Sequence, residues 1–144
     1  MDKFEFCSEA WVGIARDYIE TQCAANDISD IRLSFCERFT DAPPELATED
    51  NNVTGWHIRI KDGKLEVGHG VIVDADLTIT ADYATVLPLA RTVFEGNAAA
   101  AAEAAKIVAA AMAAGKMSRD GDETAMSKAT FLAGMHDVLA KRTL

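Results

Sequence analysis

The chain of 144 residues has few basic side chains, few cysteines and no long hydrophobic run. Fourteen Lys and Arg residues against 23 Asp and Glu residues leave a net charge of −9. This balance argues against nucleic acid as a partner, because nucleic acid favours clustered basic residues. It also argues against electrostatic docking on anionic membranes. The three cysteines Cys7, Cys23 and Cys36 lack metal-ligand spacing, which favours free thiols in a reducing compartment.

No segment has the pattern of a membrane span or of a secretory leader. A span needs ~20 apolar residues, and the alanine-rich tract that comes closest is interrupted by Glu103 and Lys106. Residues 1–5 lack the hydrophobic region of a signal peptide. We therefore expect a cytoplasmic protein without stable membrane insertion, folded as a single domain over residues 1–144.

Alternating apolar and polar residues predict the strands of a sheet. Residues 55–60 and 65–67 alternate with a period of two, which places one side of each strand against a core. Asp62-Gly63 separates these runs and is a strong hairpin signal, because glycine accepts the positive φ of the turn. Residues 31–39 and 74–80 alternate in the same way and predict two further strands.

One carboxylate does not fit this alternation. Glu37 falls on the apolar side of the strand predicted over residues 31–39. It marks a bulge, the place where the strand leaves the core, or a buried functional carboxylate. The last interpretation requires partners, because a buried charge is costly.

Helical spacing predicts four helices. The first begins at the N-cap Ser8, and the second extends over residues 82–96, with Pro88 causing a kink or a later start. The third is the alanine-rich segment 98–114, because alanine is the best helix former. The last follows residue 122 and carries an apolar stripe made by Phe131, Leu132, Met135, Val138 and Leu139.

The order of these elements resembles the sterol carrier protein 2 (sterol-binding) domain family. The resemblance rests on the N-terminal helix, the hairpin GWHIRIKDGKLEVG, and the strand DADLTITAD leading to a helix that closes with glycine. It also rests on the Gly-Lys strand ending in Gly-Asp, here residues 115–122, and it covers roughly residues 8–139.

The resemblance implies an α+β fold with a curved, mostly antiparallel sheet of about five strands, covered on one face by helices, and an apolar cavity between the two layers. It further implies binding or transfer of a hydrophobic small molecule, such as a sterol or steroid, a fatty acid or a fatty acyl-CoA. Members of the family are generally not enzymes.

We expect the ligand to contact side chains on the inward faces of these elements. Flexible methionines suit varied apolar ligands, although they fill ordinary cores equally well. No metal or cofactor is expected, because His57, His69 and His136 lack ligand spacing and no Rossmann or Walker motif is present. The expected ligand-binding residues are Ile58, Ile60, Leu65, Leu77, Ile79, Leu87, Met112, Met126, Phe131, Met135 and His136.

Two other functions stay open. One is a cofactor-independent isomerase, lyase or hydratase acting on a hydrophobic metabolite in the same cavity. It needs a titratable group inside the cavity, and His136 and Glu37 are the candidates. The other is a homodimer formed through the stripe of the last helix or through the alanine-rich helix, which is compatible with ligand binding.

Overall fold

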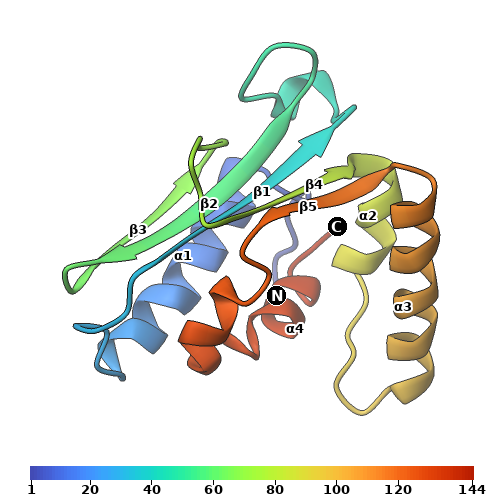
Figure 1. The fold of residues 1–144 in the computed structure, drawn as a ribbon. Coiled ribbons are helices and arrows are strands. Elements are labelled where there is room, and N and C mark those ends of the chain that lie inside the picture. The colour runs from blue at the N-terminus through green and yellow to red at the C-terminus, as the bar shows by residue number, and fades with distance from the viewer.

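The five strands form one mixed sheet in the order β3-β2-β1-β4-β5. The computed structural model describes residues 1–144 and places the helices on one face of this sheet (Figure 1). The strands are β1 (Leu33–Thr40), β2 (Thr54–Lys61), β3 (Lys64–His69), β4 (Leu77–Asp82) and β5 (Met117–Gly121). The helices are α1 (Glu9–Ala24), α2 (Tyr83–Ala90), α3 (Ala98–Ala113) and α4 (Met135–Ala140), with the 3₁₀ segments η1 (Pro44–Leu46) and η2 (Ala125–Leu132). Only β1 and β4 pair in parallel, so the expected α+β class with a mostly antiparallel, helix-covered sheet is confirmed.

The hairpin between β2 and β3 forms where the sequence predicts it. Lys61 pairs with Lys64 across a turn made by Asp62 and Gly63. These two residues have φ values of 53° and 72°. Positive φ at both central positions matches the twist of the flanking strands, and it explains the Asp-Gly dipeptide.

The connection from β3 to β4 crosses the face of the sheet that is opposite the helices. Gly55 lies beneath this crossing, and a Cβ atom built on it would be 2.7 Å from Val71 Cγ2. Cys36 of β1 is fully buried on the same face, and all three cysteines are free. The crossing brings β4 to the far side of β1, and this makes the β1–β4 pair parallel.

Helix α2 ends earlier than predicted. Asp82 caps it by accepting a hydrogen bond from the Thr85 N–H at 3.0 Å, but the helix stops at Ala90 rather than at residue 96. The segment after Ala90 is held outside the helix by the Asp137 carboxylate, which accepts from the N–H groups of Phe94 at 2.8 Å and Glu95 at 3.0 Å. These two hydrogen bonds lower the pKa of Asp137.

The last helix of the sequence analysis is two shorter segments, η2 and α4. Ala129 has non-helical backbone angles of φ −125° and ψ 61°, so continuous i→i+4 hydrogen bonding is broken there. Leu132 and Leu139 of the predicted stripe are buried in the protein's own core, whereas Val138 is 37% exposed. The stripe is therefore mostly covered within one chain.

An aromatic cluster joins the N-terminal segment to the centre of the sheet. The Phe6 ring lies 5.1 Å from that of Trp11 and 4.8 Å from that of Phe39. Trp11 also meets Trp56 edge-on at 5.6 Å, and its Nε1–H donates to Thr143 Oγ1 at 3.0 Å. The two ends of the chain are thereby tied to one core.

None of the helices combines the length and the hydrophobicity that a membrane-spanning segment needs.

Candidate functional site

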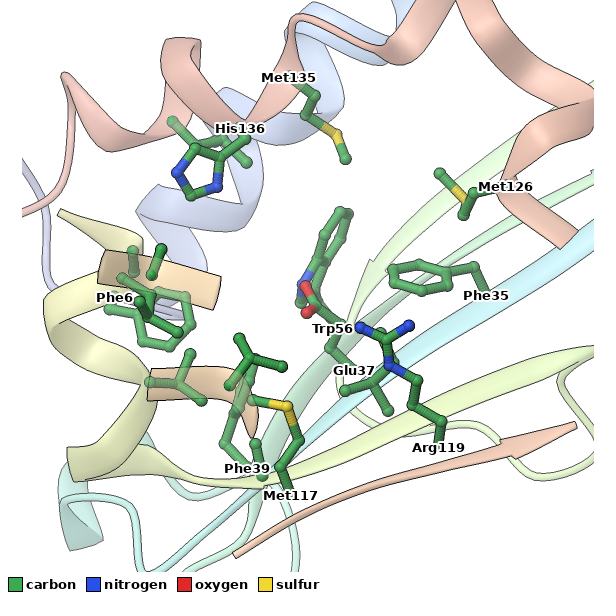
Figure 2. Close-up of a pocket in the computed structure, with 18 of the residues that line it drawn as sticks. Phe6, Phe35, Glu37, Phe39, Trp56, Met117, Arg119, Met126, Met135 and His136 are labelled. Atoms are coloured by element: carbon green, nitrogen blue, oxygen red, sulfur yellow. The ribbon is translucent and has the colours of Figure 1, made fainter. Parts of the chain in front are cut away.

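An apolar cavity of about 430 Å³ lies between the inner face of the sheet and the helices (Figure 2). It is lined by 21 residues, of which 18 are hydrophobic. The sheet contributes Phe35, Glu37, Phe39, Trp56, Ile79, Ala81, Met117 and Arg119. The remaining elements contribute Phe6, Trp11, Val86, Leu89, Ala90, Phe94, Ala104, Ala105, Val108, Met126, Met135, His136 and Leu139. A volume of about 300–1,000 Å³ is usual for small-molecule sites.

The alanine-rich helix α3 forms one wall of this cavity. It presents Ala104, Ala105 and Val108 to the space, and Ala111 is its single buried residue. Alanine methyl groups fill little volume, so the helix bounds the space without occupying it. This accounts for a cavity at this place rather than a filled core.

The carboxyl group of Glu37 is one of the few polar groups in the mostly apolar lining of the cavity. Its Oε1 accepts a hydrogen bond of 2.8 Å from the Nε1–H of Trp56 on the neighbouring strand β2. Its second oxygen, Oε2, has no hydrogen-bond partner in the protein and opens into the cavity. Burial raises the pKa of Glu37, and the bond from Trp56 opposes part of that rise. The register of β1 is continuous through Glu37, so the bulge interpretation is wrong, and a functional role for this carboxyl group stays a prediction.

Arg119 is placed on the same wall by strand register. Glu37 pairs with Ile79, and Ile79 pairs with Arg119, so all three side chains lie on the inner face of β1, β4 and β5. Arg119 is exposed at the edge strand, and no ion pair joins it to Glu37. Figure 2 shows its guanidinium group extending along the wall toward the carboxylate. The cavity therefore has a carboxyl group inside and a basic group at its rim.

His136 of α4 faces this wall from the helical side (Figure 2). Its ring stacks on Phe94, with centroids 4.4 Å apart and planes 5° apart. Its Nε2 lies 2.9 Å from the Thr92 carbonyl oxygen, which can only accept, so Nε2 carries a proton. In the neutral ring Nδ1 is then an acceptor.

The structure brings four of the eleven expected ligand-binding residues to the cavity, namely Ile79, Met126, Met135 and His136. Contact of these four with a ligand stays a prediction. The other seven lie elsewhere. Ile58, Ile60 and Leu77 are buried in the core, while Leu65, Leu87 and Phe131 are partly buried and pack against it. Met112 is 41% exposed.

The position of α1 accounts for two of these seven residues. This helix packs on the β2–β3 side of the sheet, so Ile58 and Ile60 meet a helix rather than open space. The cavity lies over β1, β4 and β5 instead. Phe35 and Phe39 alternate with Glu37 in one strand, a signal that could have placed them in the site. Phe6 and Phe94 lie outside regular elements, and no sequence pattern marks them.

No family model matches the chain, and no curated protein matches it. Solved structures do. A crystal structure of sterol carrier protein 2 is 16% identical, covers 96% of this chain and 100% of its own, and has a TM-score of 0.54. The sterol carrier protein domain 2 of Helicoverpa armigera is 19% identical over 97% of this chain and 93% of its own, with a TM-score of 0.51. A conserved hypothetical protein from Thermus thermophilus is 16% identical over 99% and 93%, with a TM-score of 0.51.

The fold and its cavity define an α+β domain built around an apolar pocket. Its architecture is the sterol carrier protein 2-like fold, as the resemblance in the sequence implied.

Proposed function

We propose that this protein binds or transfers a hydrophobic small molecule, which it holds in the cavity. The ligand class is a sterol or steroid, a fatty acid or a fatty acyl-CoA. One observation carries the proposal: the space of about 430 Å³ is not filled by the protein's own side chains, and 18 of its 21 lining residues are hydrophobic. Burying roughly 300 Å² of apolar ligand surface contributes about 7 kcal/mol, before the entropic cost of association.

The sterol carrier protein 2-like fold supports the same proposal, because structures with this fold include proteins named as sterol carriers. We place the protein in the cytoplasm, where three free and buried cysteines suit a reducing environment. A homodimer through the largely exposed helix α3 stays a prediction, which a sedimentation mass of one chain would contradict.

A second candidate function is the cofactor-independent isomerase, lyase or hydratase. The observation that favours it is the pair of titratable groups, Glu37 and His136, in the lining of an apolar cavity. A carboxyl group whose pKa is raised by burial suits proton transfer to or from a bound molecule near neutral pH. Loss of turnover in Glu37→Gln with ligand binding retained would support this function over a simple carrier.

The first experiment is native mass spectrometry of gently purified protein, with organic extraction of any bound molecule. An apolar adduct released by the extraction would support the proposal and identify the ligand class. A protein that stays empty when offered sterols, fatty acids and acyl-CoA would contradict it.

Two variants of α4 then test the site. Met135→Glu places a charge in the cavity wall and should weaken uptake of a fluorescent fatty-acid probe by roughly tenfold or more. Val138→Glu is the matched control, because Val138 belongs to the same helix, does not line the cavity and is 37% exposed. Equal uptake by the two folded variants would remove Met135 from the site.

A further inference from the structure

The cavity wall contains one acceptor that the protein itself leaves without a partner. Glu37 Oε1 is bound by the Trp56 indole at 2.8 Å, and Oε2 opens into the apolar space. Carboxylate oxygens accept several hydrogen bonds, and buried polar groups are normally satisfied. A ligand that enters the cavity must therefore form a hydrogen bond with Oε2, or it covers this oxygen and binds less tightly.

We propose that Glu37 Oε2 is a polar subsite that selects an apolar ligand with a hydroxyl group at its buried end. This inference rests on the proposed function and names the ligand chemistry within it. The hydroxyl group binds Oε2 while the apolar body of the ligand lies against the aromatic and methionine side chains of the cavity. An apolar molecule without a donor would strip water from Oε2 and return no hydrogen bond.

A hydroxyl group suits this position better than other polar groups do. It donates to Oε2 when Glu37 is ionised and accepts from it when Glu37 is protonated, so it fits both states. Burial raises the pKa of Glu37, which brings the protonated form closer to neutral pH than for an exposed glutamate. An ammonium group would fit only the ionised form.

A ligand carboxylate is directed to a different place. Arg119 offers it a positive charge, but this side chain is exposed at the rim of the cavity, beyond Ile79 from Glu37. His136 is the other polar group of the lining, and its protonated Nε2 is already used by the Thr92 carbonyl.

The test is a competition assay with probes of one chain length: a long-chain primary alcohol, its methyl ether, the corresponding amine and the corresponding fatty acid. Each displaces a fluorescent apolar probe from the wild-type protein, Glu37→Leu, Glu37→Gln and Val138→Leu. Above the raised pKa of Glu37, where the carboxylate only accepts, the wild type should bind the alcohol roughly tenfold more tightly than the ether. Glu37→Leu should bind both equally. Val138→Leu is the control, because Val138 does not line the cavity and is 37% exposed, and this variant should keep the preference.

Glu37→Gln preserves shape and an acceptor for Trp56, so it covers the case in which Glu37→Leu does not fold. Its amide N–H₂ serves an ether oxygen as well as a hydroxyl oxygen, and the preference should fall to about one. Above the pKa of Glu37, equal binding of alcohol and ether by the wild type, or tightest binding of the amine or the fatty acid, would overturn the subsite and leave the carrier function intact. Failure of every probe to bind the wild type would contradict both.

Discussion

The bond between Trp56 and Glu37 supports a quantitative prediction. Trp56 is 1% exposed, meets Trp11 and Phe35 edge-on at 5.6 Å and 6.3 Å, and donates its indole N–H to the carboxyl group at 2.8 Å. Trp56→Phe keeps an aromatic ring but removes the donor. The variant therefore leaves a carboxyl group in the cavity wall with no partner from the protein.

Two effects add up in Trp56→Phe. A hydrogen bond to a charged group contributes about 1.5–3 kcal/mol to stability. The smaller ring leaves part of the indole volume empty and weakens the edge-on contacts, which costs roughly 1–2 kcal/mol. We expect a total loss of about 2.5–5 kcal/mol, which for a chain of this length lowers Tm by roughly 5–20 °C.

A double-mutant cycle with Glu37→Leu separates the two effects. Each single variant leaves one polar group of the pair unsatisfied, whereas the double variant removes both. Urea unfolding of the four proteins should give a coupling energy of about 1.5–3 kcal/mol, with the double variant more stable than the sum of the singles predicts. Losses that add to within about 0.5 kcal/mol would show that the hydrogen bond contributes nothing to stability, and the reasoning about Glu37 would fail.

Two further predictions concern Glu37 and the glycines. Because burial raises the folded-state pKa of Glu37 above its ordinary value of 4.5, the stability that this group contributes is present at acid pH and lost as pH rises through the raised pKa. Glu37→Gln should therefore become more stable relative to the wild type as pH rises from 4.5, measured as the free energy of unfolding in urea. A difference between the two proteins that does not change with pH would contradict the burial argument. Gly55→Ala should lose roughly 1–3 kcal/mol or more, because its methyl group meets the Glu37 backbone oxygen and Val71. Gly13→Ala in α1, where the added methyl group contacts nothing, should gain about 0.5–1 kcal/mol in stability. Equal changes in Tm for the two variants would contradict the predicted steric clash at Gly55.

Local patterns in the sequence determined the elements whose signals are complete within a few residues. The Ser8 cap of α1 forms as predicted, with its hydroxyl group accepting from the Trp11 N–H at 3.2 Å. The β2–β3 hairpin follows from Asp62-Gly63 and from strict alternation on both sides. Alternation also placed Glu37 on the apolar face of its strand, but the continuous register of β1 in the structure was needed to exclude a bulge.

Only the tertiary structure decided where the space in the core lies. A strand pattern identifies the buried face of Ile58 and Ile60, but it does not say that α1 covers them and leaves the cavity over β1, β4 and β5. The early end of α2 depends on the Asp137 carboxylate, which is more than forty residues away along the chain. The pairing of Glu37 with Trp56, and the alignment of Arg119 on the same wall, depend on which strands become neighbours. Such contacts join distant residues through strand order and helix docking, and hydrophobic periodicity carries no information about either.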